Sequence, residues 1–154
     1  MKGFSKILFV LIVMLTACSP SAPSASQPGI EISNANVVLP GGDAMGGMGL
    51  DSTLGAYMQI KNNSATDDRL IAVTSDFAEA TTLHETAMNG DVATMNGLTS
   101  IDIPAGTTIE LKHGGLHIMF MDPTKDLKVG DSVNLVLEFE KAGKLTVSAK
   151  VTDQ

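Results

Sequence analysis

Two histidines and two methionines in the middle of the chain have the types and spacing that could bind a metal ion. They are His84, Met95, His117 and Met119, and ten, twenty-one and one residues separate them in turn. Thioether sulfur selects for Cu(I), and imidazole nitrogen tolerates this ion. If His117 and Met119 share a strand, the two-residue repeat places their side chains on one face. The four residues together predict a Cu(I) site.

A hairpin signal between the first two of these residues suggests how they meet. Asn89-Gly90 is the dipeptide most typical of a two-residue type I′ turn, because both central positions need a positive φ. With this dipeptide as the loop, His84 lies directly opposite Met95, with Cβ atoms roughly 4.5–5.5 Å apart. The prediction depends on the register, since a shifted turn changes every pair.

The elements that must position these side chains are predicted to be strands. Short segments of partly alternating hydrophobicity are separated by Gly, Pro and Asn turns, and no helical stripe is longer than about two turns. The segments are 30–39, 53–61, 69–74, 77–88, 91–98, 101–103, 107–111, 116–121, 132–140 and 144–151. We therefore expect an all-β fold, a single antiparallel β-sandwich or barrel.

The first residues have the pattern of a processing signal. Lys2 and Lys6 precede an apolar run of eleven residues, 7–17, which is too short to span a bilayer. The run ends at Leu15-Thr16-Ala17-Cys18, which is typical of a bacterial lipobox with Cys18 as the lipidated first residue; the alternative is an ordinary secretory signal with an incidental cysteine. The expected organisation is a signal peptide at 1–17, a lipidated cysteine with a flexible tether at 18–29 and one domain at 30–154.

Composition narrows the classes of partner. Removing residues 1–17 takes away two lysines and no acid, so the formal net charge changes from −7 to −9. This acidity argues against nucleic acid and anionic headgroups as direct partners. Cys18 is the only cysteine, so a lipidated chain has neither a disulfide nor a thiolate ligand. We expect a membrane-anchored extracytoplasmic protein with a packed core.

The spacing resembles the signature of a known family, the periplasmic copper chaperones (PCu(A)C-type) that supply the dinuclear CuA centre of cytochrome c oxidase. That signature is His-x10-Met-x21-His-x-Met, and the resemblance covers about residues 30–152. Similar flanking motifs are Ala56-Tyr57-Met58, Asp67-Asp68-Arg69-Leu70, Leu83-His84-Glu85, Ile103-Pro104-Ala105-Gly106, Gly115-Leu116-His117-Ile118-Met119 and Phe139-Glu140-Lys141-Ala142-Gly143. The resemblance implies a cupredoxin-like Greek-key sandwich and a non-enzymatic Cu(I) carrier. It also implies two partners, the CuA domain of oxidase subunit II and a Sco-type thiol protein.

Other functions stay open at this point. The protein could be a copper-buffering or resistance lipoprotein, a copper oxidoreductase, or a β-sandwich that binds partners and no metal. Met45 and Met48, in a glycine-rich loop at 40–49, and His113, in a glycine-flanked turn, are candidate accessory ligands. Alternatively, the two methionines are adaptable packing residues, and His113 is an ordinary surface histidine. Met58 and Met121 are expected in the core or at the edge of the site.

Overall fold

The computed structural model describes residues 25–27, 29–39, 54–90 and 92–153, and in this part of the chain the regular elements are all strands. None of the described segments is a helix long and apolar enough to cross a membrane. The strands are β1 (Ala25–Gln27), β2 (Ile30–Val38), β3 (Leu54–Asn62), β4 (Asp68–Ser75), β5 (Ala78–Asn89), β6 (Val92–Leu98), β7 (Ile101–Ile103), β8 (Thr108–Leu111), β9 (Leu116–Pro123), β10 (Ser132–Phe139) and β11 (Gly143–Thr152). The all-β prediction is confirmed, and the bounds of the ten predicted strands differ from the observed ones by at most two residues.

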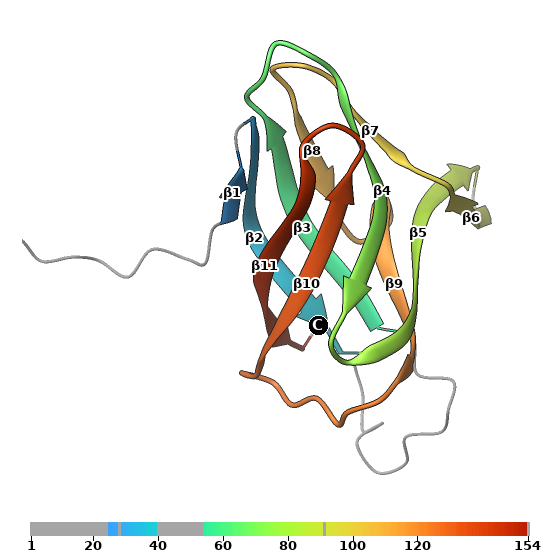
Figure 1. Ribbon diagram of the computed structural model, residues 1–154. Helices are drawn as coiled ribbons and strands as arrows, with labels where there is room; N and C mark the ends of the chain where they lie inside the picture. Colours follow the sequence, from blue (N-terminus) through green and yellow to red (C-terminus); the bar gives the residue numbers. More distant parts are fainter. Residues whose placement is uncertain (1–24, 28, 40–53, 91, 154) are drawn as a thin grey trace, which may run out of the picture.

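The strands pair into one sheet that folds over into two layers. The hydrogen-bonded order is β6-β5-β9-β3-β2-β11-β10-β4-β7, with β1 added to β2 and β8 added to β3. In Figure 1, β11, β10 and β4 lie in front of β2, β3 and β9. The described pairs are antiparallel except β2 with β11, which is parallel. The predicted sandwich is therefore correct, but it is not purely antiparallel.

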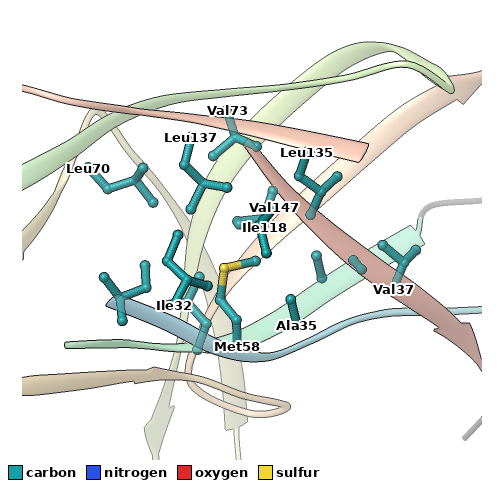
Figure 2. Close-up of a cluster of buried hydrophobic side chains, with 14 of the residues drawn as sticks. Ile32, Ala35, Val37, Met58, Leu70, Val73, Ile118, Leu135, Leu137 and Val147 are labelled. Atoms are coloured by element: carbon teal, nitrogen blue, oxygen red, sulfur yellow. The ribbon is translucent and has the colours of Figure 1, made fainter. Parts of the chain in front are cut away.

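The core lies between the two layers and consists of the inward-facing residue of each alternating pair. Leu135 and Leu137 of β10 face Ile32 of β2 and Met58 of β3 across this space (Figure 2). Met58 is 2% exposed, which confirms its expected place in the core. Burial of the aliphatic layer stabilises the fold by roughly 25 cal/mol per Å² of apolar surface removed from water.

A buried carboxylate joins two of the family-like motifs, those at residues 67–70 and 139–143. Asp68 is 7% exposed, and its carboxylate accepts hydrogen bonds from the backbone N–H groups of Arg69 (2.7 Å), Lys141 (2.9 Å) and Ala142 (2.9 Å). The Arg69 guanidinium bridges to Asp102 at 3.0 Å. These motifs therefore stabilise the turn between β10 and β11.

Two features of the fold differ from the sequence prediction. Residues 25–27, predicted as part of a flexible tether, form β1 and pair with β2 at Ile30–Ile32. The end of β5 and all of β6 lie apart from the two layers (Figure 1). The residues of β6 from Val92 to Gly97 are exposed, because this strand pairs only with β5 in the described sheet.

Candidate metal site

The paired strands β5 and β9 bring three of the four predicted ligands together. His84 is the register partner of His117, and Thr82 is the partner of Met119. Directly opposed residues share a face, so His84, His117 and Met119 lie on the same side of the sheet. The intervening Leu83 and Ile118 are buried in the core on the other side. The predicted common face of His117 and Met119 is confirmed.

The imidazole of His84 has an unsatisfied nitrogen. Its ring stacks on that of His117, with centroids 5.7 Å apart and planes at 28°. Nε2 lies 2.8 Å from Oγ1 of Thr82, whereas Nδ1 is buried and has no hydrogen-bond partner among the described residues. A metal ion on Nδ1 requires the proton on Nε2, where Thr82 accepts it. An orphaned buried nitrogen costs about 1–3 kcal/mol, so a metal ligand is a good explanation for it.

The imidazole of His117 is oriented by backbone. His117 is only 7% exposed, and its Nδ1 lies 3.0 Å from the carbonyl oxygen of Gly115. A carbonyl can only accept, so Nδ1 carries the proton and Nε2 keeps its lone pair. The same carbonyl accepts a hydrogen bond from Thr86 N–H at 3.0 Å. Gly115 thus fixes the tautomer of His117 and ties β9 to β5.

The electrostatics of the site favour a neutral ring at His84. Burial lowers the pKa of His84 below its ordinary value of 6.5, and the nearby charge of protonated His117 lowers it further. A neutral imidazole is the form that binds metals, so fewer protons compete for His84 near neutral pH.

The position of Met95 corrects the predicted hairpin register. Met95 pairs with Thr86, and His84 pairs with Gly97, so His84 and Met95 are diagonal neighbours instead of direct partners. The strand continues through Asn89, and Gly90, with φ of +63°, begins the turn. The observed register pairs Leu83 with Leu98 on the core side, whereas the predicted one placed Leu83 opposite Asn96.

The shift moves the pairing by two residues, so it keeps Met95 on the face of His84. Diagonal neighbours are about 7–8 Å apart at their Cα atoms, which long side chains can bridge. Met95 is 54% exposed, because β6 does not pack against the two layers. The site therefore has a buried end at His117 and an open end at Met95.

Two cavities flank these side chains. One, of about 300 Å³, is lined by Met95, His117 and Met119 together with His113 and Tyr57. The other, of about 520 Å³, is lined by His84, Met119 and Met121, among others. Met119 borders both cavities and so lies between them, and Met121 is at the edge of the site, as expected.

Tyr57 and Gly55 are site residues that the sequence analysis did not identify. A Cβ added to Gly55 would lie 2.8 Å from the Tyr57 hydroxyl, so the phenol lies over this glycine. Gly55 is also the register partner of Met119. Burial raises the pKa of Tyr57 above its ordinary value of 10, so its hydroxyl keeps its proton. Their two-residue spacing in a predicted strand indicates that Gly55 and Tyr57 share a face, and this was the signal in the sequence that could have linked them.

Of the other predicted site residues, the structure describes only His113. His113 is exposed and lines the smaller cavity. Met45, Met48 and Cys18 lie outside the described residues. Within the described chain, no three His, Cys, Asp or Glu residues are grouped so that they could hold a metal ion. The predicted ligands of this site are therefore two imidazoles and two thioethers, without an acidic group.

Comparison with known proteins places the chain in a family. Residues 30–151 match the family model of the LpqE-like proteins, which are described as candidate lipoproteins. One relative, the candidate lipoprotein Lxx21020 of Leifsonia xyli subsp. xyli (strain CTCB07), is 29% identical over 150 residues, which cover 93% of this chain and 85% of the relative.

Solved structures share the fold. The copper-bound PCuAC domain from PmoF2 has a TM-score of 0.70 at 24% identity, covering 85% of this chain and 98% of that domain. The Cu(I) form of DR1885 from Deinococcus radiodurans has a TM-score of 0.58 at 27% identity, covering 79% and 78%. The resemblance seen in the sequence is thus confirmed, and the fold is that of the PCuAC domains. Since the family match runs from β2 into the last residues of β11, the chain belongs to the LpqE-like family.

Proposed function

We propose that this protein is a lipid-anchored extracytoplasmic Cu(I) chaperone that delivers copper to the CuA centre of cytochrome c oxidase. One Cu(I) is bound by His84, Met95, His117 and Met119. The acceptor is the CuA domain of oxidase subunit II, with a Sco-type thiol protein as a second partner. The protein carries copper and does not act as an enzyme.

The observation that carries this proposal is the unpartnered Nδ1 of His84. It is buried beside the ring of His117, whose own Nδ1 is occupied by a carbonyl, leaving Nε2 free. Met119 lies on the same face, and Met95 lies on the neighbouring strand of the hairpin. Two free imidazole nitrogens beside two thioethers suit a soft monovalent ion.

The comparisons support copper as the cargo. DR1885 has been solved in its Cu(I) form, and the PmoF2 domain has been solved with copper bound. DR1885 is 27% identical to this chain over most of its length. The candidate-lipoprotein descriptions of the LpqE-like family and of Lxx21020 support the anchor that we assign to Cys18.

The donor set suggests how copper is held and released. All four donors are neutral, so the bound ion keeps its single positive charge. A thiolate of an acceptor neutralises that charge and binds the soft ion more strongly than a thioether does. Transfer to a cysteine-containing site such as CuA is then favourable, and it needs an exposed ligand, which Met95 provides.

An anaerobic Cu(I) titration of residues 19–154 against a coloured chelator tests the proposal. Every described strand lies within this segment. We expect one tight equivalent, lost in the variant with alanine at all four ligands and strongly weakened in the H117A/M119A double variant, with circular dichroism unchanged. Parent-like affinity in the double variant refutes the ligand assignment.

Two further assays separate the alternatives. Loading an apo CuA domain from the copper-bound protein, followed by the CuA absorption spectrum, tests delivery. Two or more equivalents that partly survive the four-alanine variant would instead indicate a copper buffer that uses Met45 and Met48. Turnover of a redox substrate by the copper-loaded protein would indicate an oxidoreductase.

A further inference from the structure

A second exposed methionine lies beside the open end of the proposed Cu(I) site. Among the described residues, five large hydrophobic side chains are exposed, and three of them lie on the hairpin of β5 and β6: Met88 (63%), Val92 (65%) and Met95 (54%). Single exposed apolar side chains need no explanation, but a group of them marks a place where something binds. Two of these three are thioethers, which are ligands for a soft metal ion.

Met88 and Met95 are neighbours on one face of the hairpin. Met88 is the register partner of Ala93, and Met95, two residues further along β6, is the partner of Thr86. Residues two apart share a face, and diagonal neighbours on paired strands lie about 7–8 Å apart at their Cα atoms. Met95 is also the diagonal neighbour of His84, on its other side. The donors therefore follow one another from the buried imidazoles through Met95 to Met88.

The surroundings leave both sulfur atoms free to approach one ion. Met95 is flanked on its own side of β6 by Ala93 and Gly97, and a Cβ added to Gly97 would meet nothing within 4 Å. The face holds no Asp, Glu, Lys or Arg between His84 and Met88 or between Ala93 and Gly97, because Glu85 points to the other side. Methionine is unbranched and flexible, so two thioethers on neighbouring strands can bind the same ion.

We propose that Met88 and Met95 form a transient two-thioether site that captures Cu(I) at the tip of the hairpin and passes it to the buried ligands. This inference rests on the proposed function, which makes His84, His117 and Met119 the destination. At capture, the two thioethers replace two weakly held ligands of the arriving ion. Met95 then stays bound while the bond to Met88 breaks and one to Nδ1 of His84 forms. Copper remains Cu(I) throughout, and no proton moves.

A ligand that acts only on the path to the bound state changes rates and leaves the equilibrium unchanged. Removing the Met88 sulfur should therefore slow the capture of Cu(I) from small ligands and its release to small ligands by the same factor. An acceptor thiolate that attacks Met95 directly does not need Met88, so this step is specific to exchange with small copper complexes.

Anaerobic stopped-flow uptake by residues 19–154 tests the inference, with the acetonitrile complex of Cu(I) as the donor. Tyr57 is the only tyrosine of a chain without tryptophan, and it lines the cavity of His117 and Met119, so its fluorescence reports arrival at the buried end. M88L keeps the apolar volume and removes the sulfur. We expect M88L to slow uptake, and release to a chelator, by about tenfold each, with the equilibrium affinity of the parent.

V92A serves as the matched control. Val92 is 65% exposed near the same tip, but it has no sulfur and precedes Ala93, so it lies on the other face of the hairpin. This variant should take up Cu(I) at the parent rate, which excludes a general effect of altering the tip.

A second measurement detects the two-thioether site directly. In the H84A/H117A variant the destination is removed, so Cu(I) should remain at the tip of the hairpin. We expect the methyl NMR resonances of Met88 and Met95 to shift together as the Cu(I) complex is added.

Parent-like uptake in M88L would overturn the inference, as would equal slowing in V92A or a methyl resonance of Met88 that does not move. A lower equilibrium affinity in M88L would also overturn it, because Met88 would then be a resident ligand. Failure of the proposed function gives a different pattern. If the parent shows no tight equivalent and no change in Tyr57 fluorescence, yet the methyl resonances of Met88 and Met95 shift, the two-thioether site is supported and the assignment of the buried ligands is wrong.

Discussion

Replacing Gly55 with alanine should weaken copper binding without unfolding the protein. The added Cβ would lie 2.8 Å from the Tyr57 hydroxyl and 3.1 Å from its Cζ, and an ordinary contact begins at 3.4 Å. The hydroxyl must therefore move by at least 0.6 Å. It borders the cavity that His117 and Met119 also line, so the displacement changes the surroundings of two proposed ligands.

The expected effect of G55A on Cu(I) affinity is larger than its effect on the free energy of unfolding. Metal–ligand distances tolerate only about 0.2 Å, and disturbed outer-shell contacts cost about 10–100-fold in metal affinity. We expect G55A to weaken Cu(I) binding by about tenfold. The free energy of unfolding should change by no more than about 1 kcal/mol, because alanine is favoured over glycine in a strand and the clashing atom is at the end of a side chain.

The assay is a double-mutant cycle with Y57F, read by Cu(I) competition and urea unfolding. Y57F removes the nearest clashing atom and leaves Cζ at 3.1 Å, so the G55A/Y57F variant should recover part of the lost affinity. Parent-like Cu(I) affinity in G55A would refute the reasoning, as would a double variant no better than G55A.

Three further predictions concern the ligands, protons and fold. M95A should lower Cu(I) affinity about tenfold or more, while M88A, a methionine 63% exposed on the same hairpin, should bind like the parent in the same titration. Because the pKa of His84 is lowered by folding, its imidazole binds a proton more readily in the unfolded chain than in the folded one. The contribution of His84 to the free energy of unfolding is therefore complete above pH 6.5 and is lost as the pH falls through the lowered pKa. Urea unfolding of the apo protein should show that loss, absent in H84A, and Cu(I) affinity should fall by at most about tenfold per pH unit for each imidazole that protonates. D68A should reduce the free energy of unfolding by about 3 kcal/mol, because three backbone N–H groups lose a charged acceptor, whereas D102A, at a side chain 79% exposed, should change it by less than about 1 kcal/mol.

Local patterns in the sequence predicted what depends on local geometry. The two-residue repeat placed His117 and Met119 on one face, and the turn signals placed most strand ends within a residue or two. The hairpin register was wrong, because the Asn89-Gly90 signal does not say which residue starts the loop. The pairing of Leu83 with Leu98 on the core side settles that choice. A tertiary contact overrides a turn preference here.

Features that depend on strand order could not be predicted from the sequence. Nothing local indicates that β9 pairs with β5, and this pairing is what sets His84 directly against His117. The phenol of Tyr57 reaches the cavity only because β3 is the other neighbour of β9. Likewise, residues 25–27 pair with the start of β2, which β11 leaves open because it pairs only with residues 36–38 of that strand. Their Ser/Ala-rich composition gives no strand signal.

The departure of β5 and β6 from the two layers explains how one fold can both hold a soft ion and release it. The histidines lie where β5 still pairs with β9, so their rings are packed together and oriented by Thr82 and Gly115. Met95 lies on β6, which has one strand neighbour in the described sheet, and its thioether is more than half exposed. Under the proposed function, we infer that an acceptor thiolate displaces Met95 first and the buried imidazoles last. The rate of transfer then depends on Met95, and the paired histidines hold the ion until the last step.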